Sequence, residues 1–316
     1  MKIQLKHENY FELDAMAPYD FELTIRRAIR IRQNFPPLED EFSDGIYWTT
    51  LRTSNIVGAK VRSIGTVDNP MLLCSLFSDG KLENKEEKEA LRSIRWMMGA
   101  NENISSFYKI AGENKVLQGI TRELNGLRML SQGGLFRSLI TGILLQNAPV
   151  RRSIAMISYL VERYGIPVTF EKRMYYAPLN PNELAKAKIE ELREGKLGYR
   201  AEYIKRISAD FEPTMEKKLG MAPTEGAKKE LMRLKGVGEY TAEFALLGSK
   251  YKERRRYDVF PVDSWSSRLY LNLFAPSKGI SKLSNDKVCR LAREHANKTW
   301  GRWKGLVLEY ALLFSL

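Results

Sequence analysis

One carboxylate in this sequence stands where it could do chemistry. Asp263 follows the apolar residues 259–262 and precedes SWSSRLYLNLF, a segment with helical apolar spacing. An aspartate at such a helix start usually serves as the N-cap, accepting a hydrogen bond from a first-turn amide. Because apolar residues and Trp265 flank it, its carboxylate is also expected to be partly desolvated and could act in catalysis. The residues alone leave both roles open.

A glycine-rich turn lies 25 residues before this aspartate. The segment 234–242 reads LKGVGEYTA and joins two stretches with helical spacing. Gly236 and Gly238 permit a tight turn, and Ala242 is small enough to let the two helices touch. Backbone amides at the start of the second helix could then bind a phosphate, which the helix dipole favours. A helix–helix connection without a ligand has the same features, so this alternative stays open.

Cysteine and histidine are too scarce for several other chemistries. The two cysteines and two histidines cannot form a disulfide framework, a four-thiolate zinc site or a four-cysteine iron–sulfur cluster. No glycine-rich nucleotide-binding motif accompanies a strand, so no ATP or NAD site is expected. Any chemistry therefore depends on carboxylates, aromatic rings or backbone groups.

The charge is uneven along the chain. Lys and Arg exceed Asp and Glu by 51 − 38 = 13. Residues 1–110 hold 15 basic and 16 acidic residues, a net of −1, which leaves +14 for residues 111–316. A basic surface confined to one part favours a polyanion, with nucleic acid the leading candidate. A lysine-rich surface that only aids solubility is the alternative.

The elements that must position these residues fall into two parts. Segments 45–65 and 70–80 are rich in β-branched and aromatic residues and predict an antiparallel sheet, while 81–99 predicts a helix. FELTIRRAIRI (21–31) is an extended arm or a short helix that Pro36 and Pro37 stop. From residue 113 on, the pattern is helical, with Thr224 as one expected N-cap.

Several motifs together resemble one known family. The hairpin LKGVGEYTA, the downstream VDSWSSR and the earlier ILLQN match the helix–hairpin–helix DNA glycosylase superfamily in order. LREGKLGYRAEYI (192–204) and WGRWKGLVLEYA (300–311) resemble two more of its segments. The resemblance implies an α+β fold. Residues 1–112 would form an antiparallel β-rich domain, half of a TBP-like fold, and 113–316 an all-α glycosylase core containing the active-site cleft.

The resemblance assigns roles to Asp263 and Tyr240. Members of the family flip a damaged base out of duplex DNA and cleave its N-glycosidic bond. Asp263 stands at the position of the essential aspartate, which would stabilise an oxocarbenium-like sugar or guide the nucleophile. Tyr240 stands where the bifunctional branch has a lysine, and a phenol cannot form an imine. A monofunctional enzyme with water as nucleophile is expected, although Tyr240 also fits a core stripe with Phe244 and Leu247.

Further pocket and DNA roles follow from the same resemblance. Trp303 and Trp300 match pocket aromatics of the 3-methyladenine type II branch, with helix packing as the alternative. An aromatic pocket suits alkylated purines, because a π-face attracts their positive charge by up to about 2 kcal/mol. Asn147, beside Gln146, matches the residue that fills the gap left by the flipped base, or else simply ends a helix. The expected DNA-binding residues are Gln146, Asn147, Gly236, Val237, Gly238 and Arg268.

A cation is also implied at the hairpin. The carbonyls of Met232, Leu234 and Val237 correspond to those that hold a monovalent or divalent cation, such as Na or K, bridging to a phosphate. No cofactor is required and no iron–sulfur cluster is expected.

Arg254 to Arg256 are expected in a solvated loop near the DNA.

The predicted function is excision of alkylated purines such as 3-methyladenine from double-stranded DNA by a monomeric enzyme. Excision of hypoxanthine, uracil or 8-oxoguanine, or a non-catalytic DNA-binding module, remain alternatives. No apolar run is long enough to span a membrane, and the first residues lack the apolar region of a secretory signal. The expected location is therefore the cytoplasm, with the nucleoid, or the nucleus.

Overall fold

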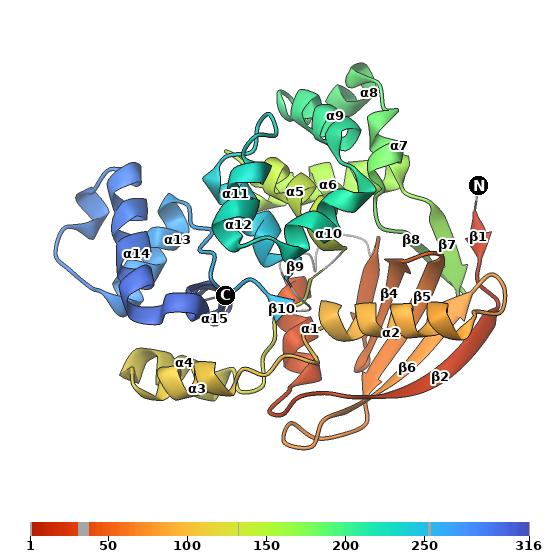
Figure 1. The fold of residues 1–316 in the computed structure, drawn as a ribbon, viewed down its shortest axis with the longest axis horizontal. Coiled ribbons are helices and arrows are strands. Elements are labelled where there is room, and N and C mark those ends of the chain that lie inside the picture. Colours follow the sequence, from red (N-terminus) through yellow and green to blue (C-terminus); the bar gives the residue numbers. More distant parts are fainter. Residues whose placement is uncertain (1, 31–37, 132, 252–253, 316) are drawn as a thin grey trace.

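The computed structural model describes residues 2–30, 38–131, 133–251 and 254–315. A five-stranded antiparallel sheet dominates the first third of the chain, in the order β2-β6-β5-β4-β3 (Figure 1). Its strands are β2 (His7–Asp14), β3 (Asp40–Ser43), β4 (Ile46–Arg52), β5 (Ile56–Ser63) and β6 (Met71–Ser78). The antiparallel sheet predicted from the segments 45–65 and 70–80 is confirmed.

Two helices cover one face of this sheet. They are α1 (Phe21–Ile29) and α2 (Asn84–Met97), and their apolar side chains share one core with the inward residues of the strands. Asp20 caps α1 by accepting from the Leu23 amide at 2.8 Å, which explains why the helix starts there. Residues 21–29 are therefore a helix rather than an extended arm; the rest of the predicted segment from residue 31 and its predicted stop at Pro36 and Pro37 lie outside the described residues.

The other face of the sheet packs against strands from distant parts of the chain. β1 (Ile3–Gln4) pairs in parallel with β7 (Pro167–Phe170), and β7 pairs with β8 (Arg173–Tyr176). Phe170 lies against Gly58 of β5, where an added Cβ would come within 2.7 Å of its ring. The expectation of an all-α second part is thus wrong at residues 167–176, because these strands close the apolar sheet face, which contains Trp48 and Phe77.

Helices make up most of the remainder (Figure 1). The α-helices are α3 (Ser105–Gly112), α4 (Lys115–Glu123), α5 (Gly134–Leu145), α6 (Val150–Tyr164), α7 (Pro181–Ala185), α8 (Ile189–Glu194), α9 (Arg200–Asp210), α10 (Pro213–Met221), α11 (Thr224–Leu231), α12 (Glu239–Leu247), α13 (Ser264–Phe274), α14 (Asn285–Trp300) and α15 (Lys304–Ser315). Two short strands, β9 (Lys250–Tyr251) and β10 (Arg254–Arg255), and two 3₁₀ turns, η2 (Ile280–Lys282) and η3 (Gly301–Trp303), complete the described elements.

A second, larger core unites these helices. It runs from Ile104 in front of α3 to Tyr310 in α15, whereas the core under the sheet runs from Leu13 to Ala100. The domain boundary at residue 112 remains a prediction. Among the helices that the structure describes, none has the length and apolarity to cross a membrane.

Two local expectations are wrong. Thr224 is the first residue of α11 and does not cap it; its hydroxyl accepts from the Arg256 guanidinium at 3.0 Å. Arg255 and Arg256 are buried rather than solvated, because Arg255 pairs with Glu102 at 2.5 Å and Arg256 also binds carbonyls at the end of α10. Only Arg254 of the three arginines is exposed.

Candidate active site

The turn between α11 and α12 is tight and depends on one glycine. The Val237 amide donates to the Leu234 carbonyl at 3.0 Å, which closes the turn. Gly236 has a φ of +90°, and a Cβ there would lie 2.4 Å from the ring of Tyr203. Both the backbone conformation and the aromatic neighbour therefore require glycine at position 236.

The start of α12 is open for an anion. Gly238 is an exposed N-cap with extended backbone, and no atom lies within 4 Å of the position that its Cβ would take. Glu239 in the first turn is drawn aside by Lys228 and Arg293, at 3.4 and 3.7 Å. The first amides of α12 are therefore accessible to a phosphate, which the helix dipole would favour. Phosphate binding there stays a prediction.

The three carbonyls expected to hold a cation belong to this turn. The Leu234 carbonyl accepts from Val237 but keeps a second lone pair, so it remains able to contact the monovalent or divalent cation expected there. Met232 is exposed and Val237 is buried. The cation remains a prediction.

Gln146 joins the end of α5 to the hairpin. Its side-chain amide donates to the Gly236 carbonyl and to the Thr241 hydroxyl, each at 2.9 Å. The main-chain carbonyl of Gln146 accepts from the Arg200 guanidinium. The next residue, Asn147, is exposed and has a φ of +46° at the tip of the α5–α6 loop. Gln146 thus positions the hairpin, whereas Asn147 is presented to solvent, where the predicted insertion into DNA requires it to be.

Asp263 combines a helix cap with a free oxygen. Its Oδ1 accepts from the Ser266 amide at 2.8 Å and from the Ser266 hydroxyl at 2.7 Å, completing a capping box at the start of α13. Within the described residues, no donor bonds to Oδ2. The carboxylate is exposed, and Trp265 beside it is 60% exposed, so the expected partial desolvation is wrong for the protein without DNA. The hydrogen bonds of the helix cap, rather than desolvation, fix the geometry of the Asp263 carboxylate.

Tyr240 lies near Asp263, and its ring extends from there into the protein. Its ring stacks on Phe244, one turn further along α12, with centroids 6.1 Å apart. Burial raises the pKa of the Tyr240 phenol far above its ordinary value, and the carboxylates of Asp263 and Glu309 raise it further. Tyr240 is therefore a neutral phenol at physiological pH, close to both acids.

Beyond Phe244 lies a cavity of about 330 Å³, a size typical of small-molecule sites. Helices α5, α6, α12 and α15 contribute to its wall, and Glu309 and Leu313 of α15 face it one turn apart. Glu309 was missed in the sequence, although it is the only acidic residue in the apolar segment KGLVLEYALLFS. That isolated charge was the available signal. Arg27 of α1 donates to the Leu313 carbonyl at 3.0 Å and holds this wall in place.

The two predicted pocket tryptophans lie elsewhere. Trp300 is buried and donates to the Tyr270 hydroxyl at 2.6 Å, and Trp303 packs between Phe107 and Tyr257. Neither lines the cavity beyond Phe244. The structure therefore favours the packing alternative for Trp300, whereas Trp303, although buried, lines a separate cavity of about 700 Å³.

Arg268 is also occupied within the protein. Its guanidinium donates to the carbonyls of Ile280 and Leu283, the latter at 2.7 Å, and so ties α13 to the loop around η2. The DNA contact expected for this side chain has no support in its position. Its role here is to hold that loop.

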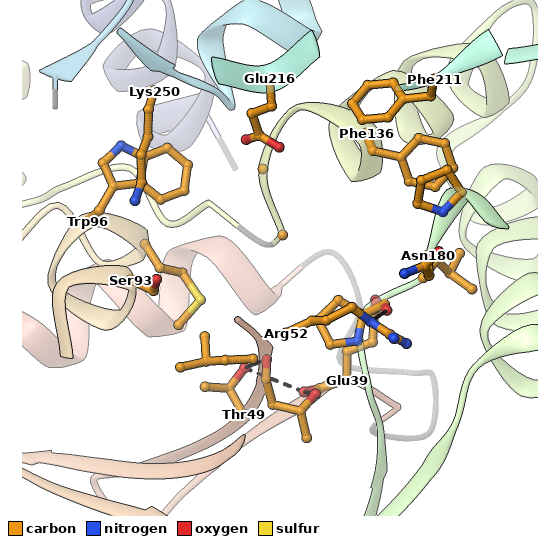
Figure 2. A pocket seen from close by; sticks show the side chains of 18 of the residues that line it. Glu39, Thr49, Arg52, Ser93, Trp96, Phe136, Asn180, Phe211, Glu216 and Lys250 are labelled. Carbon is orange, nitrogen blue, oxygen red and sulfur yellow. Dashed lines mark hydrogen bonds between the residues drawn. The ribbon is translucent and has the colours of Figure 1, made fainter. Parts of the chain in front are cut away.

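A second cavity, of about 340 Å³, lies between the sheet and the helical part. Figure 2 shows Trp96 and Lys250 on one side of it, Phe136 and Phe211 on another, and Glu216 above. Neither Asp263 nor Tyr240 lines it. Glu39 lines both cavities and pairs with Arg137 at 2.6 Å, so this ion pair stands between them.

Comparison with known proteins supports one family of folds. No protein-family model matches the sequence. A DNA-3-methyladenine glycosylase of Bacillus subtilis (strain 168) is 24% identical over 226 residues, 67% of this chain and 71% of that protein. The structure resembles a 3-methyladenine DNA-glycosylase from Archaeoglobus fulgidus with a TM-score of 0.77 and 20% identity, over 96% of this chain and 98% of the other.

It also resembles the Clostridium acetobutylicum 8-oxoguanine glycosylase/lyase solved with double-stranded DNA containing cytosine opposite 8-oxoG. The TM-score is 0.70 at 17% identity, over 98% of both chains. The likeness extends over almost the whole length in both structures, including the first third with its sheet. The resemblance to the helix–hairpin–helix glycosylases is thereby confirmed at the level of the fold.

Proposed function

We propose that this chain, which has the fold of the helix–hairpin–helix DNA glycosylases, is a monofunctional DNA glycosylase that excises alkylated purines from duplex DNA. The observation that carries the proposal is the placement of Asp263, a capped carboxylate with one free oxygen, near Tyr240, whose ring stacks on Phe244 in the cavity wall. The curated relative named for 3-methyladenine supports the substrate class.

The geometry divides the work among three parts. The amides at the start of α12 bind a backbone phosphate next to the lesion. Asn147, on the exposed loop after α5, enters the gap left by the flipped nucleotide. The extruded base then enters the cavity, where the Phe244 ring, which stacks on Tyr240, offers a π-face to a cationic purine.

Asp263 acts on the sugar. As the N-glycosidic bond breaks, its electron pair passes to the base, so that a cationic alkylpurine leaves as a neutral molecule. The Asp263 carboxylate stabilises the positive charge that develops on the sugar. Water then forms the new bond to C1′ and releases a proton. Because position 240 is a phenol, which cannot form an imine, no Schiff base forms there and the DNA strand stays intact.

The decisive experiment is a single-turnover assay on duplexes that carry one lesion each: 7-methylguanine, hypoxanthine, uracil or 8-oxoguanine. Base release with strand cleavage only after alkali is expected, with 7-methylguanine released fastest. Asp263→Asn should abolish release, whereas the matched control Asp20→Asn, an N-cap on α1 far along the chain, should not.

Other results would change the conclusion. Strand cleavage without alkali, trapped by borohydride, would identify an amine nucleophile and contradict the monofunctional assignment. Faster release of hypoxanthine, uracil or 8-oxoguanine would reassign the substrate. Binding without release from any lesion would leave a DNA-binding module.

A further inference from the structure

Unlike the buried or half-buried acids Glu39, Glu102, Glu216 and Glu243, Glu309 has no bonded partner among the residues that the structure describes. Glu39 pairs with Arg137, Glu102 with Arg255, and Glu243 with Arg293, at 2.6, 2.5 and 2.6 Å respectively. Glu216 accepts from the Leu135 amide at 3.0 Å. For Glu309, no hydrogen bond or ion pair joins it to any residue that the structure describes, although it is half-buried in an otherwise apolar helix.

An unpaired carboxylate in such a place destabilises the fold. Removing a charge from water without a partner is costly, and a protein usually avoids it by pairing or by neutralising the group. Here burial raises the pKa of Glu309 to about 7, although the positive charge of Arg255 opposes this. A buried acid with a shifted pKa in the wall of a cavity is typical of a functional site.

The other charged side chains of the cavity wall are already engaged. Arg27 donates to the Leu313 carbonyl, and Arg137 pairs with Glu39. Arg128 donates to main-chain carbonyls, those of Met16 and Gly126 among them. These groups shape the wall. Among the charged side chains of the wall in the described chain, the Glu309 carboxyl group is therefore the one available to an incoming molecule.

We propose that Glu309 is the specificity-determining residue of this cavity and selects purines that carry a positive charge. The inference rests on the proposed function and deepens it. With Phe244 offering its ring and Glu309 its carboxyl group, a base entering the cavity meets a π-face and an acid without a bonded partner. Both favour a cation, and the carboxylate also accepts from a ring N–H or exocyclic amine. A neutral base of the same shape gains much less.

The selectivity of the wild type and of Glu309→Gln tests this. Single-turnover excision is measured for 7-methylguanine, which is cationic, and for hypoxanthine, which is neutral. Glutamine keeps the shape and removes the charge, so the ratio of the two rates is expected to fall about tenfold or more, through loss on the cationic base. Glu294→Gln, an exposed acid of α14, is the matched control and should leave the ratio unchanged.

Each outcome is decisive. An unchanged ratio in Glu309→Gln, or equal loss on both lesions, would overturn the role of Glu309 while leaving the proposed function intact. No release of any base by the wild type would overturn the proposed function, and this inference with it. Should Glu309→Gln not fold, Glu309→Asp serves instead: it retains the charge but withdraws it by one methylene, and a smaller drop in the same ratio is expected.

Discussion

The side-chain amide of Gln146 donates to the carbonyl oxygen of Gly236 over 2.9 Å, although 90 residues separate the two. Through this bond the loop that presents Asn147 and the turn that would bind phosphate become one rigid unit. A base-flipping enzyme requires that relation, because the residue that fills the gap and the residues that grip the backbone must act on neighbouring nucleotides.

Replacing Gln146 should therefore weaken DNA binding as well as folding. Gln146→Leu removes two hydrogen bonds, worth about 1 kcal/mol each, and releases the hairpin from α5. We expect several-fold weaker binding to a duplex with an abasic-site analogue, measured by fluorescence anisotropy. Gln118→Leu, at an exposed position of α4, is the control. Equal binding by the two variants would show that the hydrogen bonds from Gln146 to the hairpin do not affect DNA binding.

The two hairpin glycines should respond differently to alanine. Gly236→Ala places a methyl group 2.4 Å from the Tyr203 ring at a φ of +90°, which we expect to cost about 1 to 3 kcal/mol of unfolding free energy. Gly238→Ala meets no atom within 4 Å and should cost far less. Denaturant unfolding of both variants measures the difference. Similar losses would mean that the turn can rearrange.

Asp263 should separate stability from activity. Asp263→Asn keeps an oxygen for the Ser266 amide, so its unfolding free energy should stay within a few tenths of a kcal/mol of the wild type while base release is lost. Asp263→Ala loses the cap as well and should be about 1 kcal/mol less stable. Calorimetry beside the excision assay makes the comparison. Full activity in Asp263→Asn would contradict a catalytic role for Asp263.

Glu309 should make stability depend on pH in a defined direction. Its pKa in the folded protein is about 7, above the ordinary value of 4.5, so the folded state holds a proton that the unfolded state has lost. The contribution of Glu309 to the free energy of unfolding is thus fully present below about pH 4.5 and is lost as the pH rises through about 7.

Glu309→Gln should accordingly be more stable than the wild type by about 1 to 3 kcal/mol at pH 8 and nearly equal to it at pH 5. Thermal melts at the two pH values check this. A variant that is less stable at pH 8 would mean that the carboxylate has a stabilising partner in solution.

The net charge of +14 in residues 111–316 predicts salt-sensitive DNA binding. Each phosphate neutralised by Lys or Arg releases counterions, so the affinity for duplex DNA should fall by orders of magnitude between about 50 and 200 mM salt. A titration series in KCl yields the slope. A flat profile would indicate that the charge excess has nothing to do with DNA.

The sequence predicted the parts of the site that depend on local chemistry. The cap at Asp263, the turn at Gly236 and the sheet with its covering helix all follow from spacing and residue type, and the structure has them. The errors arise where distant contacts decide. Arg255 and Arg256 form part of a basic run in the sequence, but Glu102 and the end of α10 bury them.

Long-range packing also explains what was missed. Trp300 and Trp303 resemble pocket residues in the sequence, and only the positions of Tyr270, Phe107 and Tyr257 show them to be core residues. Glu309 acquires its meaning from the cavity around it, which four helices and α1 create together. No pattern within α15 reveals that cavity.

The bond from Arg27 to the Leu313 carbonyl joins residues 286 positions apart. Closing so long a loop is entropically expensive and slow compared with local helix formation. The wall that would receive the base therefore depends on a contact between the two ends of the chain. A separately expressed helical part would lack the guanidinium that holds its final helix, and so would be a poor substitute for the whole chain.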